Sequence, residues 1–339
     1  MTISNEKRHA RRRALGVLSA AAVGALAALS APVRAQGRAT LRIGFQKYGT
    51  LTILKARGTL DKRLAAQGID VKWIEFPAGP QLLEGLNVGS VDFGTVGEAP
   101  PIFAQAAGAN LVYVGNEPPA PAGEAIVVPK TSTLKSVADL KGRKVVLNKG
   151  SNVHYLLVKA LEKAGLEYKD IEVVYLPPAD ARAAFERGSV DAWVIWDPFL
   201  AAAEKQLGAR ILADGKGLVS NHQFYLASRP YAERNGEIVR TIIDELARVD
   251  DWGRQNTREV AAILSAQIGL EPAVIELAAT RYTYGVKPIS DAVLNEQQKI
   301  ADVFAGLKLI PKKNQCQGRR AAAQVVSRLN MIEQERTSP

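Results

Sequence analysis

The chain has 339 residues, of which 47% are hydrophobic and 23% are charged. This composition is typical of a folded globular protein and argues against disorder. The formal net charge is +10, but the first 35 residues, with six cations and one anion, supply +5 of it. The rest is spread along the chain without a basic run, so the charge does not favour a nucleic-acid partner.

The first 35 residues have the pattern of an export signal. Basic residues up to Arg13 precede an uncharged, alanine-rich stretch, Ala14–Ala31, and small residues follow at Val33 and Ala35. This order predicts a signal peptide cleaved after Ala35 and a periplasmic protein. A membrane anchor is the alternative, because the uncharged stretch is close to the shortest length that spans a bilayer. The arginines leave the twin-arginine route and the general export route both open.

After the signal, strand-like and helix-like patterns alternate. Apolar runs at 41–47, 71–77 and 91–100 predict three strands. Between them, apolar residues recur at helical spacing over 51–64 and 82–86. This part of the chain therefore predicts a strand–helix–strand–helix–strand unit.

The same succession recurs about a hundred residues later. Its five parts lie at 144–150, 153–161, 171–177, 181–185 and 190–198. The tetrapeptide GSVD occupies equivalent places in the two units, at 89–92 and at 188–191. Alternating strands and helices predict parallel sheets covered by helices. The repetition predicts two related α/β lobes.

The segments around the second unit predict how the lobes are joined. Extended-looking runs at 122–130 and 222–230 flank it and would carry the chain from one lobe to the other and back, and the chain after Pro230 has mostly helical periodicity. The predicted organisation is a signal peptide at 1–35, lobe 1 at 36–125, lobe 2 at 126–225, a returning helical part of lobe 1 at 226–315, and a C-terminal tail or helix at 316–339.

The sequence contains none of the common catalytic motifs that we sought, among them G-x-S-x-G, H-E-x-x-H, C-x-x-C and the P-loop. Cys316 is the only cysteine, and outside the signal there are two histidines, His154 and His222. We therefore expect no disulfide, no metal site, no cofactor and no catalysis. An enzyme that uses Glu98, Asp197 or His154 as acid or base remains the rival reading.

Ligands of open parallel α/β sheets bind beyond the carboxyl ends of the strands. At one such end, Gly150-Ser151-Asn152 opens a helix, where free N–H groups and the helix dipole favour an anion. The alternative is that Ser151 only caps the helix. At another strand end, Trp196 is a candidate for a cleft wall, with core packing as its alternative.

Two long stretches carry a family resemblance, "WIEFPAGPQLLEGLNVGSVDFGTVGEAPPIFAQAAGANLVYVG" at 73–115 and "PPADARAAFERGSVDAWVIWDPF" at 177–199. They resemble the aliphatic sulfonate-binding proteins of ABC importers. The resemblance implies a two-lobed type II periplasmic-binding-protein fold that closes on its ligand by hinge bending. It also implies a monomer that delivers a sulfonate, for sulfur acquisition, to a membrane permease driven by a separate ATPase. The ligand-binding residues that it implies are Gln46, Gly97, Glu98, Gly150, Ser151, Asn152, His154, Trp196 and Asp197.

The chain departs from the family pattern at three places near the expected site. Glu98 stands where the family usually has aspartate, Asn152 and Val153 replace two hydroxyl residues, and Tyr48 stands before a glycine that usually follows the lysine directly. These departures leave the ligand's identity open. A receptor of the same class for taurine, nitrate or a heterocyclic precursor is the alternative.

Overall fold

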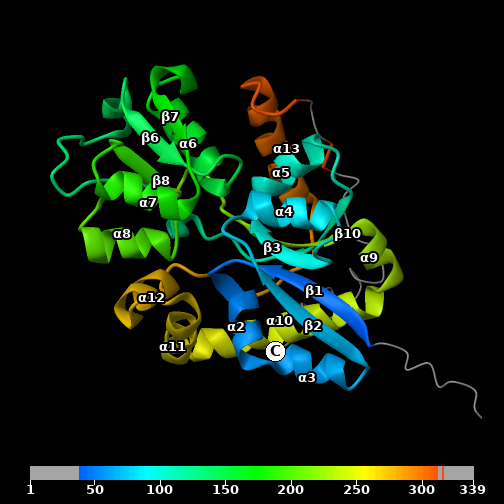
Figure 1. Ribbon diagram of the computed structural model, residues 1–339. Helices are drawn as coiled ribbons and strands as arrows, with labels where there is room; N and C mark the ends of the chain where they lie inside the picture. The colour runs from blue at the N-terminus through cyan, green and yellow to red at the C-terminus, as the bar shows by residue number, and fades with distance from the viewer. Residues whose placement is uncertain (1–37, 312–314, 317–339) are drawn as a thin grey trace, which may run out of the picture. The chain divides into compact units, whose positions relative to one another are not determined.

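The computed structural model describes residues 38–311 and 315–316. The predicted signal peptide and nearly all of the predicted C-terminal segment lie outside the described residues. The described residues from Thr40 onward belong to one compact unit. It contains two five-stranded sheets, so the mixed α/β class with two related lobes is confirmed (Figure 1).

The first sheet has the strand order β2-β1-β3-β10-β4. Strands β1 and β3 are parallel, whereas β10 is antiparallel to both of its neighbours, β3 and β4. The strands are β1 (Ala39–Phe45), β2 (Ile69–Glu75), β3 (Phe93–Gly97), β4 (Leu111–Asn116) and β10 (Gln223–Ser228). The helices between them are α2 (Gly49–Arg57), α3 (Thr59–Ala65), α4 (Gly79–Asn87) and α5 (Pro100–Ala106).

The second sheet has the equivalent order, β7-β6-β8-β5-β9, and its antiparallel insert is β5. The strands are β5 (Glu124–Val128), β6 (Lys144–Leu147), β7 (Glu172–Tyr175), β8 (Ala192–Trp196) and β9 (Arg210–Asp214). Its helices, green in Figure 1, are α6 (Asn152–Lys163), α7 (Pro178–Glu186) and α8 (Phe199–Leu207). Three short 3-10 turns complete this part: η1 (Pro121–Gly123), η2 (Val137–Leu140) and η3 (Tyr168–Asp170).

In the described part of the chain, five helices follow β10, and the last four of them agree with the helical periodicity of this region. They are α9 (Arg229–Arg234), α10 (Gly236–Gln255), α11 (Thr257–Ile268), α12 (Pro272–Ala279) and α13 (Asp291–Gly306). Helix α10 packs on α2 and α3 of the first lobe, and α13 packs on α5. Helix α12 instead contacts α8 of the second lobe. Within the described part of the chain, no helix combines the length and the apolar character needed to cross a membrane.

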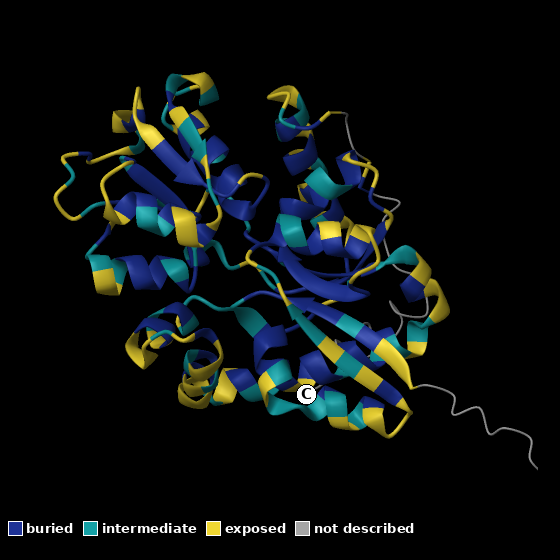
Figure 2. Ribbon diagram, in the orientation of Figure 1, coloured by how far each residue is buried: buried dark blue, intermediate teal, exposed yellow. Residues whose placement is uncertain are grey.

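The central strands β3 and β5 are buried on both faces of their sheets. Successive side chains of a strand point to opposite sides, so each central strand contributes to two cores. In β10, Tyr225 faces the core beneath α2 and α10, whereas Phe224 faces the core beneath α4. In β5, Ile126 and Val127 divide in the same way between the α6 side and the α7 side. Figure 2 shows the resulting dark-blue interior of both lobes.

The repeated tetrapeptide GSVD has the same structural role twice. The Asp92 carboxylate accepts the backbone N–H of Arg42 at 2.9 Å, and the Asp191 carboxylate accepts that of Lys144 at 2.8 Å. In return, each aspartate N–H donates to the carbonyl of the same partner at 2.8 Å. The glycine that opens each copy ends the preceding helix with φ of 74° or 69°, a backbone conformation that glycine adopts without strain. GSVD therefore ties the last strand of each unit to the first.

The chain passes between the sheets at 117–123 and at 215–222. The boundaries expected at 125 and 225 fall inside β5 and β10, because both extended runs are buried strands that belong to one sheet each. We propose that the two connecting segments act as hinges and that the two lobes meet beside them.

Candidate functional site

Two small cavities adjoin at the ends of the strands. The polar cavity, of about 30 Å³, is lined by five of the nine residues implied by the family resemblance: Gln46, Gly97, Ser151, Asn152 and Trp196. The aromatic cavity, of about 60 Å³, is lined by Trp196 and Asp197. Four residues line both cavities and connect them: Tyr48, Trp196, Asn221 and Gln223.

Helix N-termini point toward the polar cavity. Gly79, the first residue of α4, and Asn152, the first residue of α6, both line it. In neither helix does the capping side chain accept a first-turn N–H, as far as the described residues go. Among those residues, the lining of this cavity contains no charged side chain. The cavity therefore offers an anion helix dipoles and polar groups rather than a counter-charge.

Asn152 joins the two lobes across the polar cavity. Its Oδ1 accepts the N–H of Ala99 at 3.4 Å, and its Nδ2 donates to Asn221 Oδ1 at 2.5 Å. The amide sits so close to Gly97 that a Cβ at position 97 would lie 1.9 Å from Asn152 Oδ1. A side chain at position 97 would therefore displace the Asn152 amide from its place in the cavity wall.

Ser151 does not cap α6 with its side chain. Its hydroxyl donates to the Asn148 carbonyl at 2.6 Å. This bond braces the turn before α6. The sequence alternative of a simple cap therefore does not describe Ser151.

His154 and Gly150 lie behind the polar cavity and line neither cavity. The Gly150 N–H donates to His154 Nδ1 at 3.2 Å, so Nε2 carries the ring proton and donates to the Tyr168 hydroxyl at 2.8 Å. Burial, together with the charge of Lys149, lowers the pKa of the fully buried His154 to about 3. A neutral His154 thus holds the loop before α6 in place, and its side chain does not reach either cavity.

Glu98 also lies outside both cavities. Its Oε2 accepts the N–H of His222 at 3.0 Å, and burial raises its pKa to about 7. Nearby Glu124 is fully buried, and burial together with the charge of Glu98 raises its pKa well above the usual range. Neither Glu124 oxygen has a hydrogen-bond partner among the described residues. Glu98 therefore contacts the second connecting segment through His222, and Glu124 begins β5 where the first connecting segment ends, so neither carboxyl group lines the two cavities.

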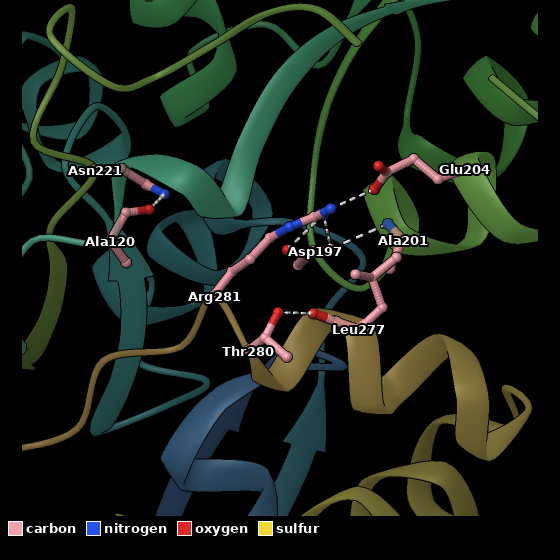
Figure 3. Close-up of polar contacts among 8 residues, drawn as sticks. All are labelled: Ala120, Asp197, Ala201, Glu204, Asn221, Leu277, Thr280 and Arg281. Carbon is pink, nitrogen blue, oxygen red and sulfur yellow. Dashed lines mark hydrogen bonds and ion pairs between the residues drawn. The ribbon is translucent and has the colours of Figure 1, made fainter. Parts of the chain in front are cut away.

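Asp197 faces the aromatic cavity and is paired with Arg281 (Figure 3). Both carboxylate oxygens lie 3.3 Å from Arg281 Nη1, and Arg281 Nη2 lies 2.6 Å from Glu204 Oε2. Asp197 also accepts the N–H of Ala201 at 3.0 Å. Burial raises the pKa of Asp197 to about 6, although Arg281 opposes the rise. The pair links the segment after α12 to the second lobe.

Several lining residues are missing from the set that the resemblance implies. Asn221 and Gln223 come from the second connecting segment and β10, and "RYTY" at 281–284 comes from the segment after α12. None of these belongs to a motif at a strand end of the repeated units. The alternation of polar and aromatic residues in RYTY was the one available signal. In the part of the chain that is described, no cluster of three or more His, Cys, Asp or Glu side chains could hold a metal ion.

Comparisons with known sequences agree with one another. The family model described as NMT1/THI5 like matches residues 64–256. The chain is 48% identical to the putative aliphatic sulfonates-binding protein of Escherichia coli strain K12, over 80% of this chain and 86% of that protein. It is 34% identical to the protein of the same description from Bacillus subtilis strain 168, over 80% and 83%.

Solved structures give the same result. The alkanesulfonate-binding protein SsuA from Xanthomonas axonopodis pv. citri, bound to MOPS, is 44% identical, with a TM-score of 0.80 over 84% of this chain and 99% of that one. The periplasmic aliphatic sulphonate binding protein SsuA from Escherichia coli is 47% identical, with a TM-score of 0.76 over 84% and 92%. The desulfurization enzyme DSZB, at 16% identity and a TM-score of 0.64 over 87% and 99%, shares the fold alone. The chain therefore belongs to the NMT1/THI5-like family and, within it, to the aliphatic sulfonate-binding proteins.

Proposed function

We propose that this protein is the periplasmic receptor of an ABC importer for aliphatic sulfonates. It is exported through a signal peptide at 1–35, captures a sulfonate as a monomer, and delivers it to a permease that a separate ATPase drives. The observation that carries the proposal is the convergence of the α4 and α6 N-termini on an uncharged polar cavity.

A sulfonate fits this cavity chemically. It is a monoanion whose three oxygens accept hydrogen bonds from amides and hydroxyls without needing a cation. A helix N-terminus stabilises such an anion by roughly 0.3–1 kcal/mol, and by up to about 2 kcal/mol when the site is partly buried. Gln46, Ser151 and Asn152 supply polar side chains in the lining. The relative from Xanthomonas holds MOPS, which is itself a sulfonate.

The lobes meet through contacts that would form on closure. Asn152 of α6 bonds to Ala99 of the first lobe, and Arg281 bonds to Asp197 and Glu204 of the second. A ligand between these contacts adds its own bonds to both lobes. It therefore binds the closed arrangement more tightly than the open one and shifts the protein toward closure. The permease would recognise the closed arrangement.

We further propose that the ligand is bound without chemical change. The alternative hypothesis of an enzyme needs Glu98, Asp197 or His154 as an acid or base at the ligand. Glu98 and His154 lie outside the cavities, where they bond to backbone N–H groups, and Asp197 is paired with Arg281. Mass spectrometry of ligand recovered after long incubation would show it intact. Recovery of sulfite or of a desulfonated product would overturn this part of the proposal.

A thermal-shift screen tests the function. The chain from Gln36 onward would be heated with MOPS, alkanesulfonates, taurine, sulfate and nitrate. A ligand at a hundred times its Kd adds about 2.7 kcal/mol of stability, which moves Tm by several degrees. The double variant Ser151→Ala/Asn152→Ala should lose the sulfonate shift. The control Ser189→Ala/Asn87→Ala, at two exposed positions, should keep it. A shift with nitrate or sulfate and none with any sulfonate would contradict the proposal.

A further inference from the structure

We propose that Glu98 and Glu124 form a proton-binding site between the two lobes, so that the protein takes up a proton when it closes on its ligand. Glu98 follows β3 in the first lobe, and Glu124 begins β5 in the second. The inference rests on the proposed function, because it assumes that the lobes open and that a bound ligand closes them.

Both carboxyl groups are buried with too few hydrogen-bond partners. Glu124 is fully buried, and neither of its oxygens has a partner in the described part of the chain. Glu98 is 2% exposed, and its Oε2 accepts the His222 N–H at 3.0 Å. Its Oε1 is also buried and lacks a partner among the described residues. A buried carboxylate in such surroundings is costly, and binding a proton removes its charge.

The two carboxyl groups also act on each other. Burial, together with the charge of Glu98, raises the pKa of Glu124 well above the usual range. Burial raises the pKa of Glu98 to about 7, although the backbone N–H groups of His222 and Asn221 favour its ionised form. Two buried carboxyl groups that repel each other as anions do not both ionise at neutral pH. We therefore treat them as one pair, which holds at least one proton in the closed arrangement.

The other titratable groups around the pair do not neutralise it. Glu98 lines a surface groove with Tyr155, Glu296 and Lys299. Glu296 is half-exposed and lies 3.4 Å from His222 Nε2, and its charge raises the pKa of Glu98 further. Burial raises the pKa of Tyr155 to about 12, so this phenol stays neutral. In the described part of the chain, neither Lys299 nor His222 forms an ion pair with either carboxyl group of the pair.

The pair lies beside the walls of the proposed ligand site. Glu98 follows Gly97, which lines the polar cavity, and Glu124 pairs across the sheet with Trp196, which lines both cavities. Because each lobe supplies one carboxyl group, opening would separate them and admit water, and both would then ionise at their ordinary pKa. The closed arrangement thus holds a proton that the open one releases at neutral pH. Acid therefore favours closure and ligand binding, and this advantage is lost as pH rises through about 7.

Proton uptake on ligand binding tests the inference. Ethanesulfonate and hexane-1-sulfonate are the probes, because neither of them titrates near neutral pH. Calorimetric titration of the chain from Gln36 onward at pH 7, in phosphate and in Tris buffer, gives the number of protons from the difference in heat. We expect about one proton for each ligand bound, and Kd should therefore rise about tenfold from pH 7 to pH 8.

A double variant assigns the proton to the pair. Glu98→Gln/Glu124→Gln imitates the neutral form of both groups, so it should bind without proton uptake and with the same Kd at pH 7 and pH 8. Glu296→Gln removes the half-exposed carboxyl group beside the pair and is the matched control, which should keep the uptake. A readout on the wild-type protein does not depend on the folding of the variant. Infrared difference spectra at pH 7 should gain the C=O band of a protonated carboxyl group when ethanesulfonate binds.

The outcomes separate the two proposals. Equal heats in both buffers, or no new carboxyl band, would overturn the proton site while leaving the sulfonate receptor intact. Uptake that persists in the double variant would also overturn it, because the proton would then bind elsewhere, for instance at His222 or Asp197. Binding of neither sulfonate, together with binding of nitrate or sulfate, would refute the proposed function itself.

Discussion

The ends of β3 and β8 occupy equivalent places in the two lobes and carry contrasting residues. β3 ends in Gly97, followed by Glu98, and β8 ends in Trp196, followed by Asp197. Gly97, which has no side chain, leaves room for Asn152, whereas the large ring of Trp196 lines both cavities. Of the two carboxyls, Glu98 turns to the connecting segment, whereas Asp197 turns to Arg281. One repeated backbone thus presents two different surfaces, and both line the polar cavity in which we propose that the ligand binds.

Removing the partner of Asp197 should have the largest effect. Arg281→Met leaves a buried carboxylate unpaired, and we expect a loss of about 3–5 kcal/mol in the free energy of unfolding at pH 8. The loss should be smaller at pH 5, because the pKa of Asp197, already about 6, rises further without Arg281 and the group is then neutral. Urea unfolding at both pH values measures it. Arg248→Met, at an exposed arginine, is the control and should cost below about 1 kcal/mol. An equal loss at pH 5 and pH 8 would contradict the explanation.

Glu98 should show the opposite behaviour, since it lacks a cationic partner among the described residues. A carboxyl whose pKa in the folded state is about 7 destabilises the protein as pH rises from about 4 through 7, because folding then opposes its ionisation. Relative to Glu98→Gln, the wild-type protein should lose roughly 3 kcal/mol of stability between pH 4 and pH 8. The measurement is the difference between the two stability–pH curves. Parallel curves would show that Glu98 ionises as freely as in water.

Gly97→Ala tests whether the glycine at the end of β3 is needed to leave space for Asn152. Its Cβ would displace the Asn152 amide, so we expect at least a tenfold loss of sulfonate affinity, about 1.4 kcal/mol. Gly306→Ala adds a methyl group where no heavy atom lies within 4 Å and serves as the control. Adding Asn152→Gly to Gly97→Ala should relieve the clash. If Gly97→Ala alone binds as the wild type does, the proposed role of Asn152 is wrong.

The two GSVD aspartates should show the smallest difference. The Asp92 side chain is 7% exposed and bonds to the Arg42 guanidinium, whereas that of Asp191 is 37% exposed and lies 3.9 Å from Arg143. We expect Asp92→Asn to cost about 1 kcal/mol and Asp191→Asn about half as much, by thermal unfolding. A larger cost at Asp191 would mean that the two copies are not related as their hydrogen bonds suggest.

Local patterns were sufficient to predict the fold. The alternation of strands and helices, the repeat and the late helices depend on side-chain periodicity, which local sequence contains. The points at which the chain passes between the sheets were harder to predict, because a buried antiparallel strand such as β5 and an extended crossing have the same apolar pattern. Which sheet a strand joins depends on residues far away in the sequence. Only this pairing distinguishes a buried strand from an extended crossing.

The site was predictable only in part, for a physical reason. Gln46, Ser151 and Asn152 lie at strand or helix ends, where topology directs polar groups to a common edge. Arg281 and Tyr284 come from a segment whose position depends on how α12 packs against α8. His154 shows the converse: the family resemblance implies that it binds the ligand, but the Gly150 N–H and the Tyr168 hydroxyl occupy both of its nitrogens.

Strand β5 follows the first repeated unit in the chain but belongs to the second sheet, and β10 follows the second unit but belongs to the first sheet. This arrangement has a consequence for how the two sheets can be completed. Strands β5 to β9 are contiguous, so the second sheet can form from residues 124–214 alone. The first sheet needs β10 between β3 and β4, and β10 is made more than a hundred residues after β4. The first sheet can therefore be completed only by a strand that lies beyond the whole sequence of the second sheet. The sheet that contains the first described strand, β1, thus also needs the last described strand, β10.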